Sequence, residues 1–362
     1  MLKRMFQAHM AIGRTFHKWV EPVFTFITLL IHHIIVSAAV KLDCLFFPSL
    51  RNKKIENPIV IVGNPRSGTT FLHRFLVSNH VGAGMQVWRM IYPSLIQQTC
   101  LKPFLPIMEK FSPTRHHAKA AHATSLTSVE TDDPSTLFRY FDGFFLYGFL
   151  LAWSDEDLID MFDPQKRDTS KRDFQWYREM WRRNLVGTNS DRVLAKLFSL
   201  GIRLPQFLEE FPDAKILYMI RDPRSTVPSG MSLVTGVLDQ RFQFWSLDEE
   251  KRQRYLGRLY HAFLDLSLRF HDDYVAGRFS KDHVMIVPYH RMMQQFDTLM
   301  GEILPFLDIT PSPEFKKNIQ ETAEKQRNFK SRHKYDLQKF GLSEDQILKD
   351  YAPIYKTFGL PK

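Results

Sequence analysis

Residues able to bind an anion are concentrated between positions 63 and 70, in the sequence GNPRSGTT. The preceding run Ile59 to Val62 is apolar and β-branched, which is typical of a strand buried on both faces of a parallel sheet. After Thr69 or Thr70, apolar residues recur at helical spacing. A strand, a tight loop and a helix N-terminus together present unpaired backbone N–H groups and a positive helix dipole. We therefore predict an anion site; a plain strand-to-helix turn with a capping threonine is the alternative.

The side chains of this loop strengthen the prediction. Arg66 supplies a planar guanidinium fork, and Gly68 lets the backbone approach a ligand closely. Further hydroxyl donors come from Ser67, Thr69 and Thr70. A nucleotide-hydrolysing P-loop reads G-x-x-x-x-G-K-[ST], and here a threonine stands where the lysine should be. That arrangement is poorly suited to the terminal phosphates of ATP.

A second stretch with anion-binding chemistry lies at residues 213–232, DAKILYMIRDPRSTVPSGMS. Ile216 to Ile220 predicts another buried strand, which the turn signal Asp222-Pro223 ends. Arg221 stands at the strand end, and Ser229 follows eight positions later in a predicted helix. An arginine fork and a hydroxyl suit a phosphate. In isolation, an Arg–Asp turn pair and a surface serine would explain the same residues.

Together the two stretches resemble the sulfotransferases that use 3′-phosphoadenosine 5′-phosphosulfate (PAPS), in the broad bacterial and Golgi-type group rather than the cytosolic subgroup. The sequence PRSGTT at 65–70 is similar to the loop that holds the 5′-phosphosulfate in that family. The resemblance implies that Arg66, Ser67, Gly68, Thr69 and Thr70 bind this end of PAPS. It also implies that Arg221 and Ser229 bind the 3′-phosphate.

The expected fold is α/β, with a central parallel sheet flanked by helices, a P-loop-like nucleotide fold with helical insertions, and an apolar N-terminal helix. No Gly/Ser/Pro-rich linker separates the two motifs. We expect an apolar, membrane-associating segment at residues 1–54 and one sulfotransferase domain at 55–362.

Sulfotransferases need a general base for the acceptor hydroxyl, usually a histidine or a glutamate. Residues 116–153 concentrate proton acceptors in their first half and aromatic residues in their second. Glu130 is the first candidate base and His122 the second, with the aromatic run as walls of an acceptor pocket. The alternative is a capped helix followed by core aromatics. The window in which many relatives carry a carboxylate offers only Arg89.

Two more basic features resemble the family pattern. Lys196 occupies the place of a lysine common before the second motif, where it either steadies the transferring group or ends a strand. Near the C-terminus, NFKSRHKYDLQKFGLS resembles the stretch that closes over the adenosine and the 3′-phosphate. Its candidate ligands are Arg332, His333 and Lys334; an ordinary solvated basic run is the alternative.

Composition limits the partners. The formal net charge of +10 suits a polyanionic co-substrate and an anionic membrane surface, and no common nucleic-acid motif is present. With only Cys44 and Cys100, the chain has neither a disulfide framework nor a zinc-ligand cluster. A sulfuryl group carries less charge than a phosphoryl group, so we expect no metal requirement.

Residues 23–40, VFTFITLLIHHIIVSAAV, are long enough to reach across a bilayer, but His32 and His33 make spanning costly. Four Lys or Arg residues lie on each side, so the positive-inside rule does not choose an orientation. Three interpretations stay open: an interfacial helix, a span, or a helix of the soluble fold. We expect a membrane-associated, cytoplasm-facing protein, with a Golgi-lumenal type II protein as the alternative.

The sequence thus favours an enzyme that moves a sulfuryl group from PAPS to a hydroxyl or amine. The apolar N-terminus favours a lipid or another hydrophobic acceptor, and a glycan remains open. The rival functions are a P-loop-like nucleotide kinase and a non-catalytic module that binds anions or membranes. A kinase would need a lysine in the first loop and a magnesium-binding carboxylate after the second strand, where the sequence has Thr69 and Arg221.

Overall fold

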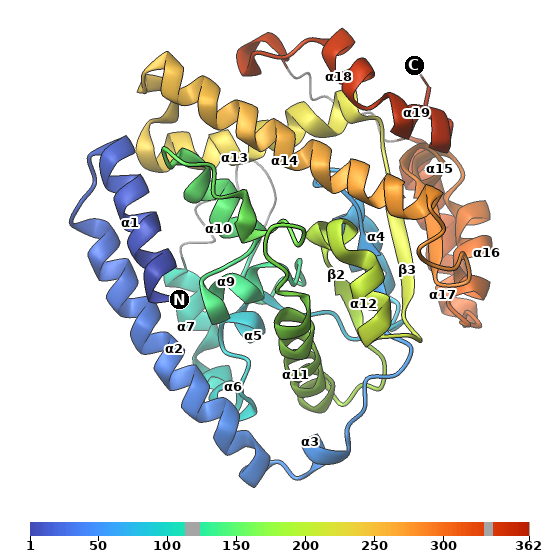
Figure 1. Ribbon diagram of the computed structural model, residues 1–362. Coiled ribbons are helices and arrows are strands. Elements are labelled where there is room, and N and C mark those ends of the chain that lie inside the picture. The colour runs from blue at the N-terminus through green and yellow to red at the C-terminus, as the bar shows by residue number, and fades with distance from the viewer. Residues whose placement is uncertain (113–123, 329–335, 362) are drawn as a thin grey trace. The chain divides into compact units, whose positions relative to one another are not determined.

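The computed structural model describes residues 1–112, 124–328 and 336–361 (Figure 1). The chain divides into two compact units, and each is described by itself. The N-terminal unit comprises Met1–Ile55, Met85–Asp191 and Met231–Ala262. The sheet unit comprises Glu56–Gly84, Arg192–Gly230 and Phe263–Lys362.

The sheet unit is built on four parallel strands in the order β2-β1-β3-β4. Their bounds are Ile59–Val62 for β1, Leu194–Lys196 for β2, Lys215–Ile220 for β3 and Val284–Pro288 for β4. The residues of β1 are wholly buried, as expected for a central parallel strand made of β-branched residues. Both predicted strands, 59–62 and 216–220, are confirmed. Because all strands are parallel, their carboxyl ends lie at the same edge of the sheet.

Helices cover both faces of this sheet. On one face, apolar residues of β1 and β3 pack against α4 (Thr69–Ser78), α15 (Tyr289–Gln294), α16 (Phe296–Phe306) and α17 (Pro313–Arg327) in a single core cluster. On the other face, Tyr218 of β3 stacks on Phe270 of α14 (Glu249–Val275), with ring centroids 3.3 Å apart. Alternate residues of each strand therefore serve the two faces.

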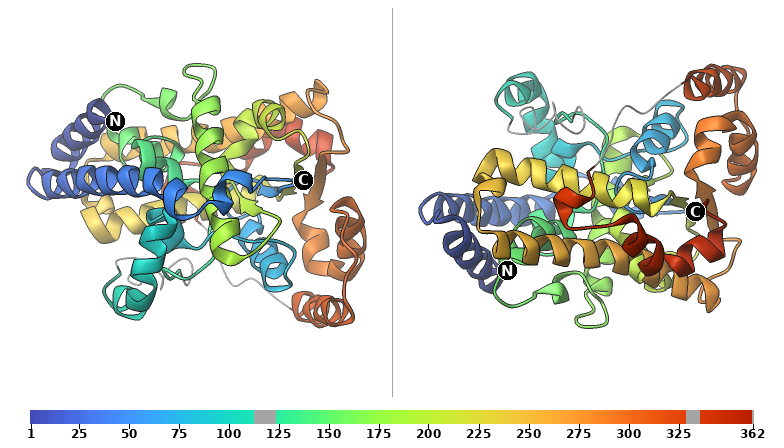
Figure 2. Two further views of the ribbon diagram at one scale, coloured as in Figure 1. Left: turned by 90° about the horizontal axis from the view of Figure 1, so that it is seen from below. Right: turned by 90° about the horizontal axis from the view of Figure 1, so that it is seen from above.

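The N-terminal unit is helical and opens with α1 (Leu2–Phe16) and α2 (Glu21–Phe46). Both views of Figure 2 show α1 on one side of α2, with α6 (Leu95–Leu101) and α7 (Leu105–Phe111) on the other. Of the described helices, α2 alone is long and apolar enough to cross a membrane, judged by length and composition. The predicted apolar N-terminal helix is thus present.

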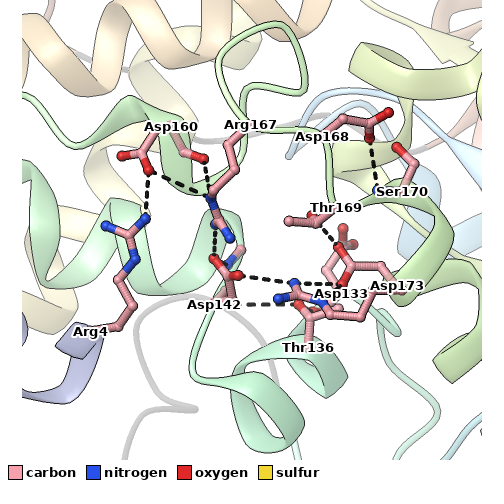
Figure 3. Close-up of polar contacts among 12 residues, drawn as sticks. Arg4, Asp133, Thr136, Asp142, Asp160, Arg167, Asp168, Thr169, Ser170 and Asp173 are labelled. Atoms are coloured by element: carbon pink, nitrogen blue, oxygen red, sulfur yellow. Dashed lines mark hydrogen bonds and ion pairs between the residues drawn. The ribbon is translucent and has the colours of Figure 1, made fainter. Parts of the chain in front are cut away.

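A network of charged side chains ties α1 to later segments of this unit (Figure 3). The Asp142 carboxylate accepts hydrogen bonds from Arg167 at 2.6 Å and Arg172 at 2.9 Å. Arg167 also bonds the main-chain oxygen of Asp160, whose carboxylate accepts from Arg4 at 2.5 Å. Burial raises the pKa of Asp142, but its two arginine partners outweigh burial and hold that pKa below its ordinary value.

The other helices are shorter connectors, except for two long ones. The long ones are α11 (Ser170–Thr188) and α13 (Pro223–Phe242). The short α-helices are α3 (Ser49–Asn52), α5 (Val87–Ile91), α9 (Pro134–Tyr140), α10 (Phe144–Phe149), α12 (Leu204–Glu210), α18 (Glu344–Asp350) and α19 (Ala352–Phe358). The 3₁₀ helices are η1 (Lys102–Phe104), η2 (Leu151–Trp153), η3 (Ile159–Met161), η4 (Phe198–Arg203), η5 (Phe244–Ser246) and η6 (Gln338–Phe340).

Candidate functional site

The first loop joins the end of β1 to the start of α4 and has an unusual backbone. Gly63, Arg66 and Gly68 all have positive φ, at 142°, 73° and 95°. The φ of Gly68 favours glycine, and a Cβ there would also lie 2.4 Å from Met292 Cε and 3.0 Å from the Tyr289 ring. Gly68 is also the N-cap of α4 and leaves the N–H groups of that ten-residue helix without a side-chain cap. These groups are available to an anion.

The two predicted motifs meet directly at this loop. Arg66 Nε donates a hydrogen bond to Ser229 Oγ at 2.9 Å, across 163 residues of sequence. Arg221 Nη1 donates to the main-chain oxygen of Arg66, also at 2.9 Å. Arg221 follows the last residue of β3, and Ser229 lies in α13, where its side chain is buried. The structure therefore brings together two arginines and one hydroxyl that the sequence assigned to opposite ends of PAPS.

Tyr289 supports this cluster and was not predicted from the sequence. It is the first residue of α15 and directly follows β4. The Arg221 guanidinium lies over its ring, 4.0 Å from the centroid. A cation–π contact of this kind fixes the plane of the arginine fork. One sequence signal could have identified Tyr289. It directly follows the apolar run VMIVP, and that run is a further parallel strand.

Lys196 ends a strand, as one of its two interpretations required, and its role toward the transferring group stays a prediction. It is the last residue of β2, and its Nζ donates to Thr70 Oγ1 at 3.0 Å. A lysine thus reaches the first turn of α4 from the neighbouring strand, although position 69 is a threonine. Lys196 is only 4% exposed, so its charge lies inside the sheet unit, beside the loop.

His73 lies one turn further along α4 and is fully buried. Its Nε2 is 2.9 Å from the main-chain oxygen of Leu194, a contact in which the imidazole N–H donates. Burial, and next the positive charge of Lys196, lower the pKa of His73 from 6.5 to about 3. His73 is therefore neutral at physiological pH and holds α4 against β2.

Asp222 directly follows Arg221 and organises the turn into α13. Its carboxylate accepts hydrogen bonds from Arg224 Nη2 at 2.8 Å and from Tyr355 Oη at 2.5 Å. Burial raises the pKa of Asp222, but these bonds outweigh burial and leave that pKa below its ordinary value. The sequence had marked Asp222 only as a turn signal. Its partner Tyr355, in α19, gave no signal at all.

Of the two candidate bases, the structure describes only Glu130. Glu130 belongs to the N-terminal unit, where its main-chain N–H donates to the oxygen of Met85 at 3.1 Å and its side chain is half-buried. His122 lies outside the described residues, as do Arg332, His333 and Lys334. The roles assigned to these five residues stay predictions.

The aromatic half of residues 116–153 matches the helix-and-core alternative. Asp133 is the N-cap of α9, and Pro134 is its first residue. Phe141, Phe144 and Tyr147 are buried in the N-terminal unit. Phe138 and Phe145 are half-buried, so the segment combines core residues with partly accessible ones, and the acceptor pocket stays a prediction.

The cluster at the carboxyl ends of β1, β2 and β3 has the chemistry of a site for a ligand with more than one acidic group. Its cations are Arg66, Arg221 and Lys196, and hydroxyls and helix N–H groups surround them. Within residues 1–112, 124–328 and 336–361, no three His, Cys, Asp or Glu side chains are grouped so as to hold a metal ion.

Comparisons with known proteins agree on a single family. The sequence model described as "Sulfotransferase family" matches residues 58–313. Two curated proteins, both named omega-hydroxy-beta-dihydromenaquinone-9 sulfotransferase Stf3, come from Mycobacterium bovis and Mycobacterium tuberculosis. Each is 26% identical over 190 residues, or 49% of this chain and 45% of the relative. The match thus spans under half the length of these relatives.

Two solved structures share the fold. Sulfotransferase STF9 from Mycobacterium avium has a TM-score of 0.70 at 18% identity, over 89% of this chain and 82% of its own. Sulfotransferase STF1 from Mycobacterium tuberculosis has a TM-score of 0.69 at 16% identity, over 97% of this chain and 90% of its own. The predicted α/β fold with a parallel sheet is confirmed.

Proposed function

Since this chain belongs to the sulfotransferase family, as its match over residues 58–313 establishes, we propose that it transfers a sulfuryl group from PAPS to a hydroxyl or amine of an acceptor. One observation carries the proposal. Arg66, Arg221 and Ser229 come from two distant stretches of sequence and form one hydrogen-bonded cluster at the carboxyl ends of the strands. A ligand with acidic groups at both its 3′ and 5′ positions matches such a cluster.

The residues fit PAPS in their chemistry. Arg66, Ser67, Gly68, Thr69 and Thr70 would hold the 5′-phosphosulfate, because the loop combines a guanidinium, hydroxyls and the N-terminus of α4. The positive φ of Gly68 gives this loop a backbone turn that other residues rarely adopt. Arg221 and Ser229 would hold the 3′-phosphate, and we propose the same ligand for Arg332, His333 and Lys334.

PAPS supplies an activated sulfuryl group, and the chain supplies position and charge. Arg66 and the N–H groups at the start of α4 stabilise negative charge on the 5′ side of the nucleotide. Lys196 holds Thr70 in place and adds positive charge beside the loop. We assign the removal of the acceptor proton to Glu130, with His122 as the second candidate.

The acceptor that we propose is a lipid or another hydrophobic alcohol, with a glycan as the alternative, on a protein that is membrane-associated and faces the cytoplasm. Two observations support this choice. The helix α2 exposes a long apolar surface. The Stf3 relatives are named for a menaquinone derivative, which is a hydrophobic molecule with a hydroxyl group.

Calorimetry with adenosine 3′,5′-bisphosphate and ATP, each with and without magnesium, tests the donor. We expect the bisphosphate to bind far more tightly than ATP and without metal. Equal affinity for ATP, or strict dependence on magnesium, would favour the kinase alternative.

Incubation of the protein with a lipid extract and with PAPS that carries radioactive sulfur then tests transfer. If the protein binds the bisphosphate but transfers no radioactive sulfur, the non-catalytic binding module is the function that remains.

A further inference from the structure

The helix α2 has two different faces along its whole length. Ten large apolar side chains on it are between 36% and 67% exposed: Val23, Phe24, Ile27, Leu30, Ile31, Ile34, Ile35, Leu42, Leu45 and Phe46. At about 100° per residue, they fall on one half of the helix surface. A helix of 26 residues is about 39 Å long, so the apolar face is a long stripe, in which one exposed cation, Lys41, lies between Ile35 and Leu42. We call these ten residues the apolar stripe.

The opposite face of α2 is fixed to the N-terminal unit by polar contacts. His32 Nε2 lies 2.8 Å from the main-chain oxygen of Ile91. Arg139 Nη1 donates to Ser37 Oγ at 2.6 Å. These contacts lie at intervals along the helix, so the docked face is held at more than one point.

Asp43, on the docked face, is completely buried. It accepts hydrogen bonds from Arg183 Nε at 2.8 Å and from Ser94 Oγ at 2.7 Å. The main-chain N–H groups of Leu95 and Ile96 donate to the same carboxylate, each at 3.1 Å. Asp43 therefore binds the N-terminus of α6 and an arginine of α11 together. A helix anchored through a buried carboxylate cannot be surrounded by lipid on all sides.

We propose that α2 lies in the plane of a membrane, in one leaflet, with the apolar stripe among the acyl chains and the docked face toward the protein. This inference rests on the membrane association proposed above and chooses among the interpretations that the sequence left open. A span would need lipid around the docked face. A helix of the soluble fold would not leave ten large apolar residues exposed.

Charge and aromatic residues at the borders of the stripe identify the partner as a phospholipid surface. Exposed Arg51 and Lys54 lie just beyond the C-terminal end of α2, and exposed Lys41 lies in its last turns on the face of the apolar stripe. Trp19 precedes the helix and is 44% exposed. Cations beside an apolar helix face attract anionic headgroups, and a tryptophan suits the depth of the headgroups.

Flotation of the full chain with vesicles of phosphatidylcholine and phosphatidylglycerol tests the surface. Ile27→Glu and Ile34→Glu each place a charge in the apolar stripe and should lower the vesicle-bound fraction about tenfold or more. Val275→Glu is the matched control, because Val275 is 63% exposed at the end of α14. It should float like the unmodified protein. Thermal melting of all three variants shows whether they are folded. If the stripe variants fold and still float fully, the proposal is wrong.

The depth of α2 in the bilayer distinguishes an in-plane helix from a span. With Cys44 and Cys100 replaced by serine, Ile27→Cys, Ile34→Cys and Leu45→Cys each carry one fluorophore. Lipids carry bromine atoms at defined depths in their acyl chains. The lipids with shallow bromines should quench all three fluorophores most strongly, and to the same extent. Deep quenching at position 34 with shallow quenching at both others would show a span and overturn the proposal.

A second copy of this chain is the remaining possible occupant of the stripe. Sedimentation without lipid tests it: a dimer that Ile34→Glu converts to a monomer, combined with no vesicle binding, would overturn the membrane assignment. These readouts do not depend on catalysis. Vesicle binding with no sulfuryl transfer would therefore contradict the proposed function and leave the in-plane helix standing.

Discussion

Tyr355 Oη donates a hydrogen bond to Asp222 Oδ1 at 2.5 Å and so ties α19 to the residue that follows Arg221. Tyr355 is 2% exposed, and the same carboxylate also accepts from Arg224. The residues on either side of Asp222 are thus held by a helix 133 positions further along the chain. The position of Arg221 depends on that helix.

Tyr355→Phe should loosen this connection without removing the ring. A hydrogen bond to a carboxylate contributes about 1.5–3 kcal/mol, so the free energy of unfolding should fall by about that amount. Because Arg221 adjoins Asp222, binding of adenosine 3′,5′-bisphosphate should weaken as well. Denaturant unfolding and calorimetry measure the two effects. Tyr274→Phe is the control, since the Tyr274 ring packs on Phe279 and Phe358 and should change nucleotide binding little.

Arg66→Ala should reduce turnover more than it weakens binding of the bisphosphate product. Charge on the 5′ side increases during transfer, so an interaction with it is worth more in the transition state than in a stable complex. We expect a loss of about 10²–10³-fold in turnover. Ser229→Ala should have the reverse effect: it should mainly weaken binding of the bisphosphate and reduce turnover less. If Arg66→Ala lowers affinity and leaves turnover unchanged, Arg66 is only an anchor.

Glu130→Gln should lower turnover at least about a hundredfold and leave PAPS affinity nearly constant. The substitution keeps shape and hydrogen bonding but removes the proton acceptor, and general base catalysis contributes about 10²–10⁴-fold. Steady-state kinetics with calorimetry of PAPS measure both quantities. His122→Ala is the companion variant. If Glu130→Gln keeps full activity and His122→Ala loses activity, the general base is the histidine.

His73 predicts a specific loss of stability in acid. Its pKa falls from 6.5 to about 3 on folding, so the unfolded chain binds a proton that the folded chain does not. Stability is therefore complete above pH 6.5 and decreases as the pH falls from 6.5 toward 3. The contribution of this one group is about 1.4 kcal/mol per pH unit in that window.

His73→Gln isolates this contribution, because glutamine keeps a donor for the Leu194 oxygen and does not titrate. Unfolding curves between pH 7 and pH 4 should show a shallower decline for the variant than for the unmodified protein. Identical pH dependence in the two proteins would mean that the pKa of His73 is the same in the folded and the unfolded chain, contrary to its burial against Leu194.

The strands and the meeting of Arg66 with Arg221 could be predicted because their signals are local. Ile59 to Val62 needs only its own β-branched composition to indicate a buried parallel strand. Arg66 and Arg221 each stand where such a strand ends, and parallel strands bring those ends to the same edge. Their contact at 2.9 Å follows from that topology.

Tyr289, Tyr355 and Asp43 could not be predicted, because their roles depend on contacts between segments far apart in the sequence. A tyrosine after a strand has no distinguishing neighbours until Arg221 lies over its ring. An aspartate near the end of an apolar helix indicates only a helix border. Its burial against Arg183 and α6 appears once those helices are placed. The aromatic run after Glu130 could not be divided between core and pocket, because pocket walls and core share the same composition.

The pairing of Asp43 with Arg183 spans 140 residues and has a consequence for how the protein is made. At about 5–20 residues per second, a ribosome needs roughly 7–28 s to add the arginine after the aspartate. Throughout that interval α2 is complete but has no docking partner on α11. We expect the nascent apolar segment to engage a bilayer or a chaperone during translation. The site of synthesis, rather than later diffusion, would then decide on which membrane the finished enzyme resides.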